Sequence, residues 1–436
     1  MYPNLYYAFK DLFGVSIPAF KLLQTFGFFV AVAFLAGAYV LTIELRRREK
    51  LGLLQGVKET IEKKQSAFTT DLAISTVIAF FVGYKLIGQL LFMRTDASGE
   101  EMRGYLLSLQ GSVAGGLVLA AAVAIYKFVK RPKDAAGREA KVVKSEAIVM
   151  PHQRVPDIIV MAAVAGLVGA KIFHNLENWG DFIADPWGSL FSASGLTFYG
   201  GLILAAVVII WYGRSKKIST RHLIDSAAPA LMLAYAIGRM GCQFSGDGDW
   251  GILNSAYAPD ANGVVQKISP EQFQAKLHEH ATFYNRQFGS LDAVHHSAFE
   301  KPGSLGFLPD WFFAYGYPHN VINEVAPITN CTQAEYCSVL PIAVYPTPLY
   351  EIIACLFFFG ILWAIRSRVT IPGVIFGIYL IFNGLERFFI EKIRVNTKYD
   401  IWLHPTQAEI ISTLMVLTGI ALIWYCRKLH LKTASR

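Results

Sequence analysis

An arginine stands near the end of a long apolar stretch, in the segment "YAIGRMGCQFSGDGDWG" that runs from 235 to 251. A charged side chain is costly at membrane depth, so Arg239 is expected to have a partner or an anionic ligand there. The alternative is an arginine whose charge reaches the headgroup region above an ordinary turn. The candidate binding residues that follow it are Gly241 and Gly251, which would let the backbone approach an anion, and Asp247 and Asp249 as partners or bases.

A second cluster of charges lies in "NGLERFFIEKIR", from Asn383 to Arg394. Arg387, Glu391 and Arg394 are spaced i, i+4 and i+7, which predicts one shared helix face. Arginine binds phosphate in a planar, bidentate way, so arginines from two helices at one depth favour a site for an anionic phospholipid headgroup. The alternative for this cluster is a structural seam of ion pairs between helices.

Other polar residues are expected at the same depth, and none of them has the spacing of a metal site. These residues are His174, Asn175, Tyr199, Tyr350, Glu351, Gln407 and Glu409. The histidine pairs "HEH" (278–280) and "HH" (295–296) lack cysteine or carboxylate partners at ligand spacing, so they are interpreted as surface histidines. We predict no metal and no cofactor.

The elements that must position these residues are membrane-spanning helices. The chain has 436 residues, of which 54% are hydrophobic and 17% charged, too apolar for a soluble protein of this size. Apolar runs long enough to cross a bilayer predict an all-α polytopic membrane protein with about nine transmembrane helices. The expected spans are 20–43, 71–93, 111–130, 157–175, 196–212, 224–243, 346–365, 371–393 and 405–426.

The charges of the short loops predict the orientation. Five loops that would share one side hold 24 Lys and Arg residues, whereas the three short loops on the other side hold 5. The positive-inside rule therefore places the N-terminus outside and the C-terminus in the cytoplasm. The first span has no charged n-region or cleavage site and is expected to be retained. The net charge of +8 is explained by loops that face anionic lipid, and no nucleic-acid partner is expected.

The chain carries an internal duplication of a two-helix unit, residues 71–131 and 157–217. "DLAISTVIAFFVGYKLIGQL" aligns without gaps to "DIIVMAAVAGLVGAKIFHNL", and "GGLVLAAAVAI" aligns to "GGLILAAVVII". Both copies run in the same direction, and they share the order Asp, VG-x-K and GGL. Only the second copy has polar and aromatic side chains at the corresponding positions, so we expect it to line a site and the first copy to act as scaffold.

A segment of different composition, 244–340, is expected to form an extracytoplasmic soluble insertion in a single transmembrane catalytic domain that spans 1–436. It contains "CTQAEYC". On the oxidising side of a membrane, Cys331 and Cys337 are expected to form a local disulfide, and the alternative is two free thiols.

The motifs around Arg239 resemble the prolipoprotein diacylglyceryl transferase family, whose signature reads approximately G-R-x-G-N-F-x-N-x-E-x-x-G. The matching residues are Gly238, Arg239, Gly241, Phe244 and Gly251, together with "FYGGLI", "PTPLYE", "GLERFFIEKIR" and Gln407. The resemblance covers 157–251 and 341–426, with part of the first span. It is that of a divergent member with a duplicated two-helix unit and an enlarged insertion.

The resemblance implies an enzyme of the bacterial cytoplasmic (inner) membrane, active at the outer leaflet. Family members transfer the diacylglyceryl group of phosphatidylglycerol to the lipobox cysteine thiol of a prolipoprotein signal peptide and release glycerol phosphate. It implies that Arg239 and Arg387 stabilise the departing phosphate, with Tyr199 and Glu391 as further catalytic residues. Phosphatidylglycerol would be bound by Arg239, Arg387, Arg394, Asp247, Asp249, Asn383, Gly241 and Gly251.

The sequence departs from the family pattern at several of these positions. Tyr199 stands where the family has histidine, and Asn383 and Phe26 stand where it often has tyrosine. Cys242 and Ser245 replace asparagines, and the signature's glutamate maps to Asp247 or Asp249. A tyrosine with a pKa near 10 is a poor base at pH 7. Our hypothesis is that Tyr199 donates a hydrogen bond to the phosphate or a glycerol oxygen, while Asp247, Asp249, Glu391 or the substrate environment activates the thiol.

Two other functions are compatible with these residues. One is another phospholipid headgroup transferase that uses the same site, and the other is a non-catalytic lipid transporter or scaffold. A transporter would be expected to place ionisable residues near the middle of the bilayer. Here they cluster at the outer end of the spans, which favours chemistry at the membrane surface.

Overall fold

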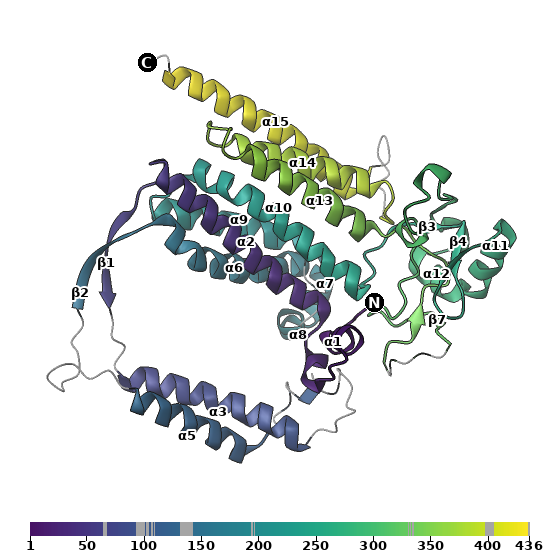
Figure 1. The fold of residues 1–436 in the computed structure, drawn as a ribbon, viewed down its shortest axis with the longest axis horizontal. Helices are drawn as coiled ribbons and strands as arrows, with labels where there is room; N and C mark the ends of the chain where they lie inside the picture. The colour runs from purple at the N-terminus through teal and green to yellow at the C-terminus, as the bar shows by residue number, and fades with distance from the viewer. Residues whose placement is uncertain are drawn as a thin grey trace.

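Every apolar segment expected to span the membrane is a helix in the computed structural model (Figure 1). The structure describes residues 1–63, 68–92, 101, 104–105, 108, 110–130, 143–192, 195, 197–329, 331, 333, 335–396 and 405–434. Parts of the loops used for the charge count, 93–100, 131–142 and 397–404, lie outside the described residues. The nine helices are α2 (Thr25–Lys50), α3 (Phe68–Phe92), α5 (Val113–Val129), α6 (Val155–Glu177), α9 (Phe198–Ser215), α10 (Thr220–Ser245), α13 (Thr347–Ile365), α14 (Val374–Glu391) and α15 (Gln407–Ala434).

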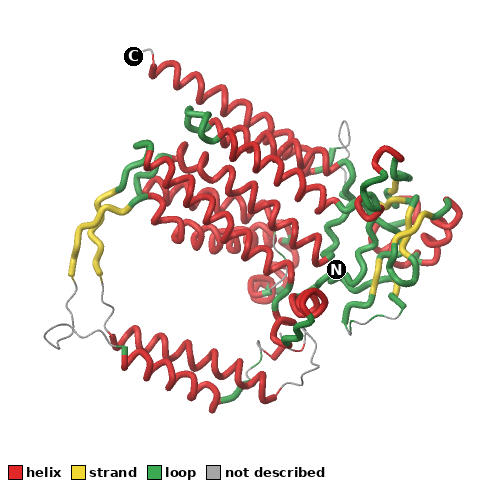
Figure 2. Tube along the Cα trace, in the orientation of Figure 1, coloured by secondary structure: helices red, strands yellow, loops and turns green. Residues whose placement is uncertain are grey.

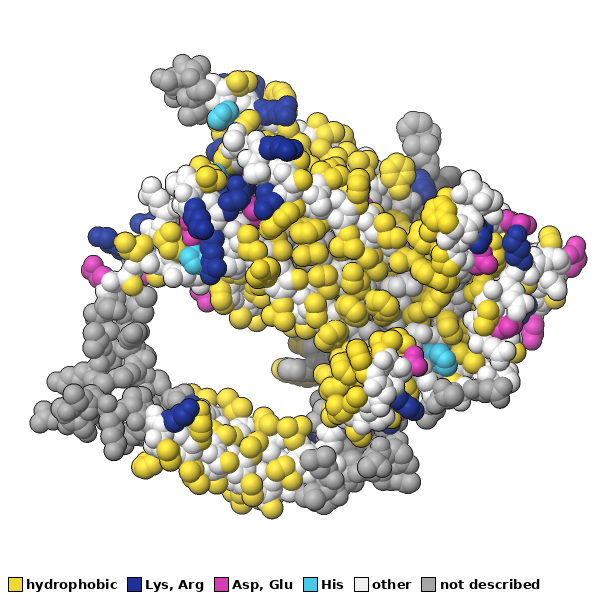
Figure 3. All heavy atoms as spheres, in the orientation of Figure 1, with side chains coloured by type: hydrophobic (Ala, Val, Ile, Leu, Met, Phe, Trp, Pro, Cys, Tyr) yellow, Lys and Arg dark blue, Asp and Glu magenta, His cyan; other side chains and the backbone are white. Residues whose placement is uncertain are grey.

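Six helices in the described part of the chain are long and apolar enough to cross a membrane. They are α2, α3, α9, α13, α15 and α6 together with the 3-10 turn η2 (Pro151–Arg154) that precedes it. Helix α5 is apolar but has 17 residues, and α10 and α14 carry the charged residues discussed below. Hydrophobic side chains form a broad belt over the helices, and lysines and arginines gather at the end of the bundle away from residues 246–346 (Figure 3). The chain is therefore a multi-pass membrane protein.

Helix α10 lies at the centre of the bundle, packed against α2, α13 and α14. Its buried side chains are mostly small, among them Ala228, Ala236 and Gly241. Small residues let membrane helices approach closely, which matters because lipid supplies no hydrophobic driving force between them. A Cβ added at Gly241 would lie 3.2 Å from the ring of Phe26 on α2. This close packing fixes the end of α10 that carries Arg239.

Buried ion pairs tie the helices together at the opposite end of the bundle. The Arg48 guanidinium on α2 lies 3.5 Å from the Asp225 carboxylate on α10. The same carboxylate accepts a hydrogen bond of 2.8 Å from the backbone N–H of Gly373, just before α14. Glu44 is fully buried and accepts a hydrogen bond of 2.6 Å from Nε of Arg366. Each of these side chains has a partner, as a charge taken out of water requires.

Helices α3 and α5 form a hairpin that packs on itself rather than on the bundle (Figure 2). A two-stranded antiparallel ribbon leads to it, made of β1 (Val57–Lys63) and β2 (Val143–Val149). The ribbon pairs Val57 with Val149 at one end and Lys63 with Val143 at the other. The sequence did not predict the ribbon, because its two strands lie about 80 residues apart and pair only with each other.

The α3–α5 hairpin and the α6–α9 pair cross in the same way. A Cβ added at Gly83 would lie 2.8 Å from the Cβ of Leu119, and one at Gly169 would lie 2.7 Å from the Cβ of Leu204. The backbone N–H of Ser112 donates to the Tyr84 carbonyl at 2.9 Å, and the N–H of Thr197 donates to the Ala170 carbonyl at 3.1 Å. The paired contacts are offset by the same 85 or 86 residues as the aligned sequences.

Residues 246–346, here called the insertion, connect α10 to α13 and lie at one end of the bundle (Figure 1). Its core is a cluster of buried apolar side chains that includes Leu253, Tyr284 and Ile342. Cys331 and Cys337 form a disulfide, as expected. Its elements are β3 (Leu253–Asn254), β4 (Tyr257–Pro259), β5 (Val265–Lys267), α11 (Pro270–Glu279), α12 (Ala281–Phe288), η3 (Leu291–Ala293), β6 (His296–Ser297), η4 (Gly303–Leu305), η5 (Asp310–Phe312), β7 (Ala326–Pro327) and β8 (Ser338–Val339).

The strands of the insertion form three short pairs: β3 with β6 in parallel, and β4 with β5 and β7 with β8 antiparallel. Short helical segments complete the fold at the end of the bundle that carries the insertion (Figure 1). They are α1 (Leu5–Phe13), η1 (Pro18–Leu22), α7 (Trp179–Ala184) and α8 (Pro186–Phe191). Helix α1 packs against the disulfide segment of the insertion, where the rings of Tyr7 and Tyr336 meet edge to face at 5.9 Å.

Candidate functional site

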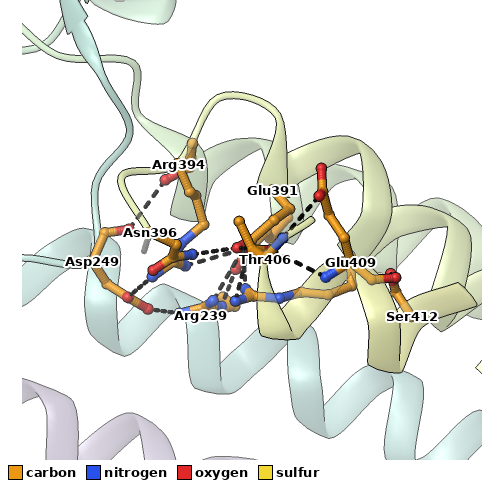
Figure 4. A network of polar contacts seen from close by, with 11 residues as sticks. Arg239, Asp249, Glu391, Arg394, Asn396, Thr406, Glu409 and Ser412 are labelled. Atoms are coloured by element: carbon orange, nitrogen blue, oxygen red, sulfur yellow. Dashed lines mark hydrogen bonds and ion pairs between the residues drawn. The ribbon is translucent and has the colours of Figure 1, made fainter. Parts of the chain in front are cut away.

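Arg239 lies in the last two turns of α10, where two carboxylates hold its guanidinium (Figure 4). Its Nη2 donates to Oε1 of Glu351 at 3.0 Å, and its Nη1 pairs with Asp249. Glu351 comes from the start of α13 and is fully buried. A buried carboxylate needs nearby cations and hydrogen bonds to offset the water it has lost. Glu351 therefore holds Arg239 in place at the end of the bundle that meets the insertion.

Arg387 enters the same cluster from α14. Its Nη1 lies 3.6 Å from Glu351, and its Nη2 lies 3.2 Å from Glu391, one turn further along the helix. Glu391 also accepts hydrogen bonds of 2.7 Å from the Thr406 hydroxyl and 2.5 Å from the Asn396 amide. The predicted i, i+4 contact between Arg387 and Glu391 is therefore present, and two residues beyond the helix support it.

Helix α14 ends at Glu391, so the prediction that Arg394 continues the same helix face was wrong. The physical reason is that the chain leaves the helix to form an antiparallel bridge between Arg394 and Gly251. A Cβ at Gly251 would lie 2.6 Å from the carbonyl oxygen of Ile393, closer than a side chain tolerates. Glycine at 251 therefore allows the bridge that places Arg394.

Arg394 reaches the site from outside the helix. Its guanidinium pairs with Asp249, and its Nη1 lies 3.5 Å from Glu351 (Figure 4). Asp249 thus lies between Arg239 and Arg394, which come from opposite sides of it. Three arginines from three places in the sequence converge on Glu351.

Asp247 lies beside this cluster, in the turn that follows α10. The turn begins at Gly246, whose φ of 65° is in the left-handed region that favours glycine. Asp247 accepts a hydrogen bond of 3.3 Å from the backbone N–H of Asp249. Burial raises the pKa of the Asp247 carboxyl above its ordinary value, and its contact with Cys242 and the nearby Arg239 oppose that shift. Among the described residues no Lys or Arg forms an ion pair with Asp247, unlike Asp249.

The remaining predicted site residues lie outside the network of contacts. Tyr199 is half-buried at the start of α9 and contacts the ring of Phe198, and within the described residues no hydrogen bond joins it to the arginines. Asn383 lies one turn before Arg387 on α14, also without such a bond. Gly241 faces α2, so its role in the structure is helix packing rather than access for an anion.

Sequence reasoning underrated two buried carboxylates. Glu351 was placed at the right depth but received no role, although all three arginines surround it. The sequence did contain a signal for this role, because a glutamate at the start of an apolar helix needs a nearby cation. Glu386 is also buried, and among the described residues it forms no ion pair. Thr406 and Asn396 carried no signal in the sequence. Among the described residues, no group of His, Cys, Asp and Glu is arranged to hold a metal ion.

Taken together, the fold and the site define a multi-pass membrane protein with a cluster of arginines and carboxylates at one end of its helical bundle. A family model described as prolipoprotein diacylglyceryl transferase matches residues 133–425, about two-thirds of the chain and all of this site. The chain belongs to this family.

Individual relatives carry the same description. A Leptospira interrogans protein named phosphatidylglycerol–prolipoprotein diacylglyceryl transferase is 32% identical over 125 residues, which cover 23% of this chain and 39% of that protein. Proteins of the same name from Clostridium novyi and Listeria welshimeri are 25% and 24% identical, cover 64% of this chain each, and are matched over 82% and 76% of their length. The match to the Leptospira protein thus spans well under half of it, whereas the other two are matched over most of their length.

Proposed function

We propose that this protein transfers the diacylglyceryl group of phosphatidylglycerol to the thiol of a lipobox cysteine in a prolipoprotein. The observation that carries the proposal is the convergence of Arg239, Arg387 and Arg394 on one point, within the region that matches the family. Three guanidinium groups in a partly buried site suit the phosphate of a lipid headgroup better than a neutral ligand.

The proposed reaction is a displacement at carbon. The thiol sulfur attacks the carbon of the diacylglycerol unit that is bonded to the phosphate oxygen. A C–S bond forms there, and the bond between that carbon and the phosphate oxygen breaks. The products are a thioether-linked diacylglyceryl cysteine and glycerol phosphate, and the thiol proton is released. The leaving phosphate gains a negative charge in the transition state, and Arg239, Arg387 and Arg394 are positioned to stabilise it.

Asp247 is the side chain best suited to take the thiol proton. Asp249 and Glu391 are held by arginines, which makes them weaker bases. The carboxyl of Asp247 has a raised pKa and, in the described part of the chain, no ion pair. We assign Tyr199 a hydrogen bond to the phosphate or glycerol of a bound lipid, because a tyrosine is a poor base at neutral pH.

The proposed topology has nine spans, with the insertion outside and the C-terminus in the cytoplasm of a bacterial inner membrane. The gathering of lysines and arginines at the end of the bundle opposite the insertion supports this orientation (Figure 3). We also propose that the α3–α5 hairpin is a duplicated copy of the α6–α9 pair that serves as scaffold. The matching glycine contacts at Gly83 and Gly169 support this origin.

The decisive experiment combines purified protein, phosphatidylglycerol and a peptide with a lipobox cysteine. Lipidated peptide with an equal amount of glycerol phosphate is the expected result. Arg239→Ala should lower kcat/KM by about 10² to 10³, the usual effect of losing one oxyanion donor. Absence of product from the wild-type protein, or full product from Arg239→Ala, would refute the proposal. Release of a different headgroup would favour another phospholipid transferase, and lipid movement without product would favour a transporter.

A further inference from the structure

A pocket of about 190 Å³ lies where the insertion meets the arginine cluster. It is separate from the contacts among the arginines, but it shares two residues with the site, Arg394 and Gly251. The other lining residues come from the insertion and from the segment after α14. Those that matter here are Leu253, Phe283, Phe288, Ile342 and Val344.

Apolar and polar groups both line the pocket, and its apolar side chains are well supported. Leu253, Ile342 and Val344 are buried members of the insertion's core cluster. Helix α12 contributes Phe283 and Phe288, which are partly buried and pack against the same cluster. Because these side chains are held in place by the insertion's core, the pocket keeps its shape. The pocket therefore offers an apolar group a supported surface beside polar groups.

The base of the pocket is continuous with the proposed reaction site. Arg394 lines the pocket, and its guanidinium also contacts Asp249 and Glu351. Its side chain is only 12% exposed, and in the described part of the chain its Nη1 makes no hydrogen bond. A group in the pocket therefore lies next to a group bound by the arginines.

We propose that this pocket binds an apolar side chain of the acceptor polypeptide, one to three residues beyond the cysteine that receives the lipid. The inference rests on the proposed function and topology, which put the pocket on the water side of Arg394. A dry apolar cavity of about 150 Å³ holds a benzene molecule, so about 190 Å³ holds one aliphatic or aromatic side chain. An extended chain advances about 3.3 Å per residue, so a side chain this near the cysteine reaches the pocket while the thiol reaches the phosphate.

The chemistry of the walls disfavours a lipid occupant. The glycerol headgroup has no apolar group to place against Phe283 and Phe288. An acyl chain would have to leave the bilayer and pass the charged cluster. The acceptor polypeptide already lies on the insertion side, and only it brings an apolar group to this place.

Two kinds of measurement test the proposal with the full-length protein in phosphatidylglycerol micelles. The first uses the wild-type protein and a series of lipobox-cysteine peptides that differ at the three positions after the cysteine. Replacing leucine there by aspartate should raise the KM for peptide about tenfold, with kcat and the KM for phosphatidylglycerol within twofold. The second uses Gln287→Trp, which fills the mouth of the pocket from an exposed position on α12. It should raise the KM for the leucine peptide about tenfold and abolish the preference for leucine.

Asn285→Trp is the matched control, because Asn285 is exposed on the same helix but does not line the pocket. It should behave as the wild type. Equal KM values for all the peptides, or an unchanged KM in Gln287→Trp, would overturn the proposal. A raised KM for phosphatidylglycerol instead of peptide would assign the pocket to lipid and also overturn it. Wild-type protein that makes no product at all contradicts the proposed function itself, so the two failures are distinguishable.

Discussion

Glu351→Gln is the substitution that most directly tests how the arginine cluster is held. Glu351 is fully buried and accepts a hydrogen bond of 3.0 Å from Nη2 of Arg239. It lies 3.6 Å from Nη1 of Arg387 and 3.5 Å from Nη1 of Arg394. Removing one partner of a buried ion pair costs about 3 to 5 kcal/mol. The loss is reduced here because Asp249 and Glu391 remain. The glutamine carbonyl also keeps one acceptor for Arg239. We therefore expect the free energy of unfolding to fall by about 2 to 3 kcal/mol.

The same substitution should make the protein more responsive to anions. Without the charge of Glu351, the three arginines face two carboxylates, and an anion that binds them restores the balance. A ligand at 100 times its Kd stabilises the folded state by about 2.7 kcal/mol. Glycerol phosphate should therefore raise the Tm of Glu351→Gln more than that of the wild type. Turnover should still fall, by about 10², because the arginines lose the group that orients them.

The assay is thermal unfolding in detergent, followed with a thiol-reactive dye. The dye reports unfolding because Cys242, Cys355 and Cys426 are free and buried. Glu386→Gln is the control, since Glu386 is a buried glutamate on α14 that forms no ion pair among the described residues. It should change stability less and show no added response to glycerol phosphate. Equal stability loss in both variants, or an equal anion response, would refute the reasoning.

Four further outcomes are expected. Asp247→Asn should lower kcat by about 10² to 10⁴. In the wild type, the rate should fall as the pH drops through the raised pKa of Asp247. A pH–rate profile of both proteins checks this. Asp249→Asn should tighten the binding of glycerol phosphate several-fold by calorimetry, because Asp249 competes with it for two arginines. Burial lowers the pKa of His319, so its neutral form stabilises the insertion above the ordinary pKa near 6.5, and this stabilisation is lost as the pH falls below that value. Hydrogen exchange around Cys331 should therefore be faster at pH 5.5 than the chemical effect of pH alone predicts from the rate at pH 7.5. His319→Gln should remove this difference. Replacing residues 64–142 by Asn-Gly should leave turnover within about threefold, because Lys63 and Val143 are paired and a two-residue turn can join them.

The positions of the helices followed from the sequence because each is a long apolar run. The ends of α9 and α13, for example, differ from the expected ones by no more than three residues. The β1–β2 ribbon was not predictable in this way, because strand pairing over a long separation leaves no local period. The expected disulfide was confirmed, since two cysteines six residues apart in one loop have few other partners.

The site was predictable in its residue types but not in its connections. Arg239 was identified from the cost of a charge inside an apolar helix, and Arg387 from its spacing to Glu391; both are local signals. Arg394 was also identified, but on a helix that ends three residues earlier. In the structure, Arg394 is positioned by a backbone bridge to Gly251, about 140 residues earlier in the chain. The hydrophobic period of a helix carries no information about such a long-range bridge. Tyr199 stays a prediction, since the described contacts leave it apart from the arginines.

The balance of charges in the cluster limits how a phosphate can bind. Arg239, Arg387 and Arg394 face Asp249, Glu351 and Glu391, so the cluster is close to neutral before any ligand arrives. A phosphate diester that bound without displacing a carboxylate would add a negative charge beside three others. It therefore has to replace one of the carboxylates at the arginines. Glu351 and Glu391 have no side-chain exposure and sit on helices, whereas the Asp249 side chain is 30% exposed and sits on a loop. Moving Asp249 costs the least buried contact, and it frees Arg239 and Arg394 together. Under the proposed function, the loop that follows α10 is therefore the part of the site that has to move when the lipid headgroup binds.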